Sequence, residues 1–61
     1  MPKELAKFEN VDKGDTLVFE GHIYTVLCRD YDFRQIIVRD FHGFSQTIKQ
    51  HEFTNGKVFI S

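Results

Sequence analysis

Short segments in which apolar and polar residues alternate run from Val11 to the end of the chain, separated by turn residues. A period of two is typical of β-strands, because successive side chains of a strand point to opposite faces of the sheet. The pattern predicts five strands, at about residues 16–19, 23–28, 34–40, 44–49 and 57–60. A tight helical turn is expected at 50–53. The predicted fold class is therefore all-β, a small five-stranded barrel or sandwich.

The same alternation selects an interior, because the side chains on one face of each strand must share one core. The opposite face carries three apolar residues, Val18, Leu27 and Ile37, which are expected to be either exposed to solvent or covered by a partner. The side chains predicted to form the core are Leu17, Phe19, Tyr24, Val26, Cys28, Ile36, Val38, Phe44, Ile48, Phe53 and Phe59.

The length of 61 residues allows one domain near the lower size limit for independent folding. Cys28 is the only cysteine, so the chain cannot form an internal disulfide. Stability must come from a dense core, for which seven Phe and two Tyr supply large apolar area, or from self-association. A lone thiol fits a reducing compartment, and neither a signal peptide nor a membrane-length apolar run is visible. A cytoplasmic protein is expected.

Residues 1–10 are expected to be an N-terminal tail or short helix, and residues 11–61 the barrel domain. Leu5 and Phe8 are spaced three apart, as in one helical turn, and Pro2 suits the start of a helix. The alternative is a frayed tail that Phe8 pins to the domain.

Catalytic and metal-binding functions find little support in the sequence. His22, His42 and His51 form no close pair with one another or with Cys28, whereas structural zinc sites normally contain one. Cys28 is predicted inside the core, where a thiol is inert. No phosphate-binding or dinucleotide motif is present. We therefore expect a protein that is not an enzyme and holds no metal and no cofactor.

One stretch of the pattern resembles a known family. The resemblance is to the opening hairpin of small Src-homology-3-like (SH3-like) barrels of bacterial and phage type, and it lies in Val11-x-x-Gly14-Asp15-x-Leu17-x-Phe19-x-Gly21-x-x-Tyr24-x-Val26. The later pieces agree, with Asp40-x-x-Gly43 between two strands and a tight turn ending in Phe53 before the last strand. The resemblance covers residues 11–60 and implies the SH3-like fold. It implies no ligand site, because the aromatic run of proline-binding members is missing.

The segment from Arg29 to Phe44 contains all three arginines of the chain together with several aromatic residues. Arginine and aromatic side chains are enriched at the energetic centres of protein interfaces. An alternative is that Asp30, Asp32 and Asp40 neutralise the arginines in surface pairs, while Phe33 and Phe41 close the barrel ends. The predicted binding residues are Tyr31, Phe33, Arg34, Arg39, Phe41 and His42.

The leading hypothesis is a non-catalytic binding module that docks on a larger protein, as an adaptor or inhibitor-like accessory protein of phage type. Tyr31, Phe33 and Phe41 would be its anchors, and Arg34 and Arg39 would pair with acidic groups.

Two alternatives remain open. In a nucleic-acid-binding barrel, Arg29, Arg34, Arg39 and Lys49 would contact phosphates while aromatics stack on bases. The net charge of −1, from eight basic and nine acidic residues, argues against it. In a homo-oligomer, the apolar residues of the second face (Val18, Leu27 and Ile37) would be buried between copies.

Overall fold

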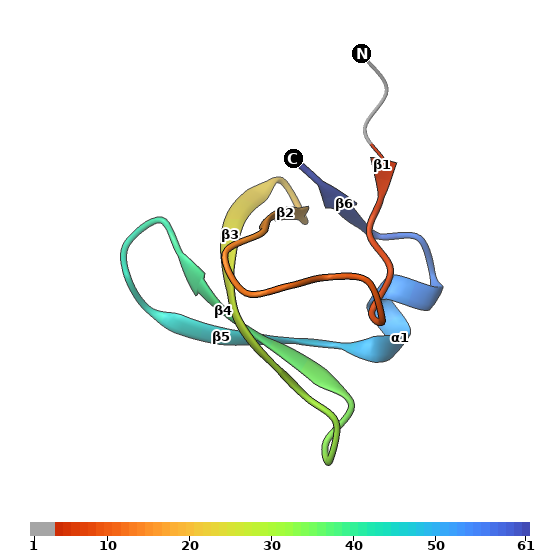
Figure 1. The fold of residues 1–61 in the computed structure, drawn as a ribbon. Helices are drawn as coiled ribbons and strands as arrows, with labels where there is room; N and C mark the ends of the chain where they lie inside the picture. Colours follow the sequence, from red (N-terminus) through yellow and green to blue (C-terminus); the bar gives the residue numbers. More distant parts are fainter. Residues whose placement is uncertain (1–3) are drawn as a thin grey trace.

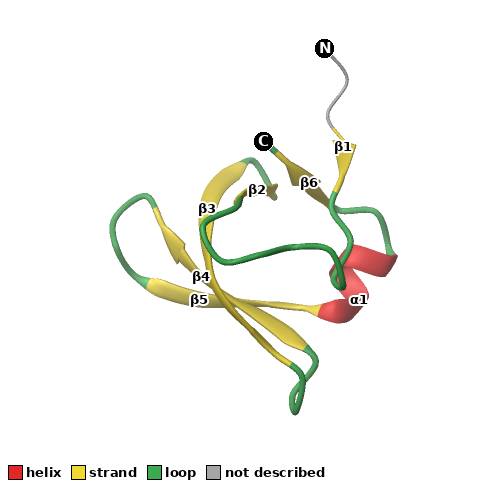
Figure 2. Cartoon of the chain, viewed as in Figure 1, coloured by secondary structure: helices red, strands yellow, loops and turns green. Residues whose placement is uncertain are grey.

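The computed structural model describes residues 4–61, whose strands form a single antiparallel sheet (Figure 1). The sheet order is β1-β6-β2-β3-β4-β5. One short helix interrupts the strands, and Figure 2 shows it at the end of β5. The elements in chain order are β1 (Glu4–Leu5), β2 (Thr16–Phe19), β3 (His22–Asp30), β4 (Gln35–Asp40), β5 (Ser45–Lys49), α1 (Gln50–Thr54) and β6 (Val58–Ile60). The predicted all-β class is confirmed.

The hairpin between β2 and β3 follows from its two turn residues. Glu20 and Gly21 both have positive φ angles, 52° and 78°, between the paired residues Phe19 and His22. Two consecutive residues with positive φ make the turn whose twist matches that of the flanking strands. This hairpin therefore sets the register in which Leu17 and Tyr24 lie opposite each other on the inner face.

Glu4 and Leu5 form a short strand, so the expectation of a helical turn around Leu5 is wrong. Glu4 and Leu5 pair with Ile60 and Phe59 of β6, and the N–H of Ala6 extends this ladder to the carbonyl of Val58 at 2.9 Å. The open edge of β6 offers these main-chain hydrogen bonds, which a single helical turn could not replace. The part of the helix prediction that concerned Pro2 lies outside the described residues.

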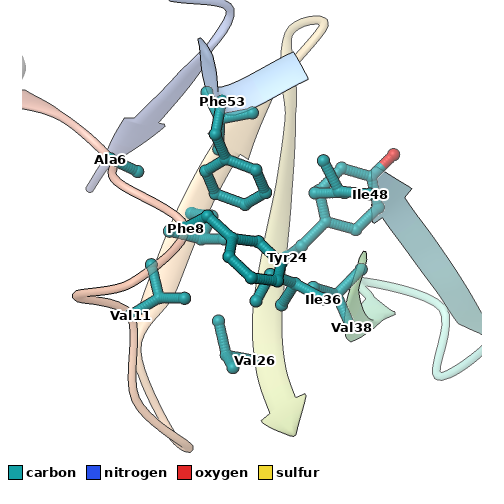
Figure 3. Close-up of a cluster of buried hydrophobic side chains, with 11 residues drawn as sticks. Ala6, Phe8, Val11, Tyr24, Val26, Ile36, Val38, Ile48 and Phe53 are labelled. Carbon is teal, nitrogen blue, oxygen red and sulfur yellow. The ribbon is translucent and has the colours of Figure 1, made fainter. Parts of the chain in front are cut away.

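The core lies on the concave side of the sheet (Figure 3). Seven residues of the predicted core are buried there: Leu17, Tyr24, Val26, Ile36, Val38, Ile48 and Phe53. The segment before β2 and the first residue of β6 complete the core with Ala6, Phe8, Val11 and Val58, which the alternation did not select. Burial of Phe8 fixes the N-terminal segment across the domain.

The other four predicted core residues are not fully buried. Cys28 is exposed, because a β-bulge between Val26 and Cys28 reverses the alternation in the second half of β3. Phe44 is 69% exposed, because it closes a turn at the end of the sheet. Phe59 is only half-buried, since the register of β6 turns Val58 inward instead. Phe19 packs against the core but is also only half-buried.

The two remaining hairpin turns project from different ends of the sheet (Figure 1). Residues 31–34 connect β3 to β4, and residues 41–44 connect β4 to β5. No helix among residues 4–61 is long and apolar enough to cross a membrane.

Candidate functional site

The six predicted binding residues do not gather into one site. Tyr31, Phe33 and Arg34 lie in the β3–β4 turn, whereas Phe41 and His42 lie in the β4–β5 turn. Strand β4 separates the two turns, and Arg39 lies on it, next to the second turn. The structure therefore offers two candidate surfaces, one at each end of β4 (Figure 1).

The β4–β5 turn is closed by the side chain of Asp40. Its Oδ1 atom accepts hydrogen bonds from the N–H groups of His42 and Phe44, both at 2.9 Å, and its Oδ2 atom accepts one from Nε2 of Gln46 at 3.0 Å. The main chain adds a bond from the N–H of Gly43 to the Asp40 carbonyl at 3.0 Å. These bonds fix the turn, because the Asp side chain satisfies main-chain donors that have no strand partner.

The same contacts act on the charge of Asp40. The N–H of Phe44 is the largest influence and lowers the pKa of this carboxyl group. Gln46 and His42 lower it further, while partial loss of solvent around the group opposes them. Hydrogen bonds to a carboxylate stabilise its ionised form, so Asp40 stays charged at neutral pH and keeps the turn closed.

Large apolar side chains point away from the protein around this turn. The exposed fraction is 90% for Phe41, 69% for Phe44 and 56% for Ile23 at the start of β3. The ring of Phe41 meets that of His42 edge-on, with 5.7 Å between centroids. None of the three apolar residues belongs to the core cluster, so the packing of the core does not depend on their side chains.

A shallow hollow of about 200 Å³ lies beside the turn. Inside it, the hydroxyl of Tyr24 is 3.5 Å from Oε1 of Gln46, and the His22 ring lies 6.4 Å from the Tyr24 ring. The hollow thus combines apolar walls with a few polar groups that can orient a ligand side chain. Its lining residues are His22, Ile23, Tyr24, Asp40, Phe41, His42 and Gln46.

Arg39 extends this surface along the convex side of the sheet. It is exposed and lies opposite Thr25, two residues from Ile23 on the same face of β3. We call the surface formed by Ile23, Arg39, Phe41, His42 and Phe44 the Phe41 face. Ile23 and Phe44 are the members that sequence reasoning missed. The position of Phe44 directly after Gly43, at the end of a turn, was the available indication for that residue.

The β3–β4 turn repeats the construction of the other turn. Oδ1 of Asp30 accepts hydrogen bonds from the N–H groups of Asp32 at 3.1 Å and Phe33 at 3.3 Å. Its Oδ2 accepts one from Nε2 of Gln35 at 3.2 Å. The turn presents Tyr31, 64% exposed, and Phe33, 70% exposed. It carries two large aromatic side chains, as the other turn does, but none of residues 31–34 lines the hollow beside the β4–β5 turn.

Arg29 has a structural role that its sequence context did not reveal. Its Nη1 atom donates hydrogen bonds to the carbonyls of Phe8 at 3.1 Å and Val11 at 2.9 Å, tying the N-terminal segment to β3. The guanidinium carbon lies 5.0 Å from the centre of the Tyr31 ring. Tyr31 in turn meets the edge of Phe8. Arg29 is therefore committed within the domain and is not free to bind a phosphate.

The alternative in which aspartates neutralise the arginines is wrong for the described part of the chain. Asp30 and Asp40 close turns, and the ion pair found among residues 4–61 joins His51 to Glu52 at 3.5 Å. Arg34 and Arg39 are exposed and have no carboxylate within ion-pair distance in this range. Their charges are available to a partner.

No cluster of three or more His, Cys, Asp or Glu side chains suited to a metal ion occurs among residues 4–61. Comparison with protein-family models, curated proteins and solved structures finds no match to this chain. The arrangement of side chains on the Phe41 face therefore has to carry the functional argument.

Proposed function

We propose that this protein is a small non-catalytic binding module that docks on another protein through the Phe41 face. The observation that supports the proposal is the exposure of Phe41 and Phe44, at 90% and 69%, in a turn closed by Asp40. An ordered turn presents these rings at a lower entropy cost of binding than a mobile loop would. Exposed apolar groups that the fold does not require commonly mark interaction sites.

The partner has an apolar groove with an acidic group at its rim. Phe41 and Ile23, which line one side of the hollow, would enter the groove of the partner. A side chain of the partner would in turn enter the hollow and contact Tyr24 and Gln46. Arg39 would meet the acidic group, because its charge is unpaired within the described chain. Aromatic and arginine side chains of this kind supply most of the binding energy at protein interfaces.

The proposal includes an SH3-like barrel and an adaptor or inhibitor-like role in the cytoplasm, in a bacterial or phage setting. Support for the fold comes from the pairing of β6 with β2 and from the helical turn α1 directly before β6. Support for a reducing compartment comes from the single cysteine, which is exposed on β3. Nucleic-acid binding is less favoured, because Arg29 is used inside the domain.

The test is site-specific photo-crosslinking in cells that carry the gene. A photoreactive phenylalanine analogue at position 41 is expected to capture a discrete protein, and Phe41→Ser/Phe44→Ser in the untagged chain is expected not to compete for it. The matched control is the analogue at position 33, which is also exposed (70%, against 90% for Phe41) but lies at the other end of β4.

Equal capture from positions 33 and 41, or full competition by the double variant, would refute the assignment of the face. Retention of RNA or DNA at low salt, lost steeply as salt is raised, would replace it with the nucleic-acid alternative.

A further inference from the structure

The outer edge of β5 carries main-chain groups without partners. In the β4–β5 ladder, the main-chain N–H of Asp40 donates to the carbonyl of Phe44, and the main-chain N–H of Gln50 donates to the carbonyl of Arg34. These two bonds show which residue pairs of the ladder are hydrogen-bonded pairs. Because these positions alternate along an antiparallel pair, Gln46 and Ile48 direct their main chain toward β4. Ser45 and Thr47 therefore direct their N–H and C=O groups away from the sheet, and no bond within residues 4–61 uses them.

The usual devices that protect a sheet edge are missing from β5. The strand contains no proline or glycine, and its register with β4 runs without a bulge from Ser45 to Lys49. Its one charged side chain, that of Lys49, is directed toward β4 and away from the open edge, since its Nζ atom donates to Oε1 of Gln35 at 2.8 Å. At the opposite edge, β1 is only two residues long, which itself limits pairing.

We propose that β5 pairs with β5 of a second copy of this chain, in antiparallel orientation about a two-fold axis at Thr47. This register places Thr47 opposite Thr47 and Ser45 opposite Lys49 of the other copy. All of these positions have outward-directed N–H groups, so the free groups of the two edges meet in hydrogen-bonding register. An edge strand that adds to another sheet gains affinity from such main-chain bonds.

The register also avoids charge repulsion between the two copies. Lys49 lies opposite an uncharged serine, so no like charges face each other across the axis. Gln46 and Ile48 of opposite copies are neighbours on the concave side. The dimer would bury the edge of β5 next to Phe44 and Gln46 but would not use Phe41 or Ile23, so variants at Thr47 test it separately from the proposed docking through the Phe41 face.

The first test is sedimentation of the full chain at concentrations up to about 1 mM, which detects even weak association. The mass of two chains is expected. Thr47→Pro is expected to halve this mass, because it removes the outward N–H without touching the bonds to β4. Thr47→Val keeps the N–H and is expected to remain dimeric. A single-chain mass for the parent protein, or a dimer that survives Thr47→Pro, overturns the proposal.

A second test does not depend on how well the proline variant folds. In an antiparallel hydrogen-bonded pair the Cα atoms are about 5.5 Å apart, which suits a disulfide. Cys28→Ser/Thr47→Cys is therefore expected to form a linked dimer under mild oxidation. Cys28→Ser/Thr25→Cys places a thiol at another exposed position, on β3, and is expected to stay monomeric. Equal linkage of both variants, or of neither, contradicts pairing at β5.

Discussion

At the scale of single residues, acidic and basic side chains in this protein serve hydrogen bonding more than ion pairing. Asp30 and Asp40 each stand at the end of a strand and accept two main-chain N–H bonds from the following turn. Arg29 donates to two main-chain carbonyls in the same way. Sequence composition alone left charge pairs open as an alternative, because the positions of unsatisfied main-chain groups are known only once the strand ends are fixed.

Replacing Arg29 with methionine is expected to destabilise the domain by about 1.5–3 kcal/mol, the usual worth of hydrogen bonds from a charged group. The carbonyls of Phe8 and Val11 lose their donor, and the N-terminal segment loosens from β3. Urea unfolding measures the change. Arg39→Met is the control and is expected to shift stability by less than about 0.5 kcal/mol, since its charge has no partner. Equal effects would mean that Arg29 is not a structural clamp.

The carboxyl group of Asp40 is expected to titrate below the ordinary aspartate pKa of about 3.9. The N–H of Phe44 is the main cause, followed among the donors by Gln46. Because the folded pKa lies below the unfolded one, the stabilisation by Asp40 is complete above the unfolded pKa and is lost as pH falls through the folded pKa.

An NMR titration of the side-chain carbons checks this pKa directly. Gln46→Ala should raise the midpoint toward the ordinary value by removing one donor, whereas Lys13→Ala should leave it in place. A midpoint at or above the ordinary value in the parent protein would show that Asp40 does not close the turn.

At the scale of elements, alternation located the strands from β2 to β6 but not every face. It predicted residues 16–19 as a strand, and β2 has the same bounds. The bulge after Val26 could not be foreseen, because it depends on how β3 bends against β4, and it moved Cys28 to the surface. Strand β1 escaped prediction for a related reason. A strand of two residues is too short to show alternation in the sequence, and β1 forms by pairing with β6.

The β2–β3 turn offers a stabilising change. Glu20 has a φ angle of 52°, which costs a glutamate side chain energy that asparagine largely avoids. We expect Glu20→Asn to raise the free energy of unfolding by roughly 0.5–1 kcal/mol. Thermal or urea unfolding measures it, with Glu9→Asn as a control outside the hairpin. A loss of stability on Glu20→Asn would contradict the assigned turn geometry.

At the scale of the whole molecule, one short chain places its aromatic residues in two environments, the core and the solvent-exposed turns. Phe8, Tyr24 and Phe53 are buried in the core, whereas Phe41 and Phe44 extend into solvent from a closed turn. The sequence predicted that aromatic and arginine residues between positions 29 and 44 form a site. It could not show that β4 would carry them to two ends of the sheet, because that division depends on the hairpin geometry.

The most direct test of this division is the stability of Phe41→Ser/Phe44→Ser in urea, with Phe53→Ser as the comparison. We expect the double variant to unfold within about 0.5 kcal/mol of the parent protein, as exposed positions do. Phe53→Ser is expected to cost at least about 3 kcal/mol, because Phe53 lies in the core. A loss of more than about 2 kcal/mol in the double variant would show that these phenylalanines hold the fold together, and would contradict a face reserved for docking.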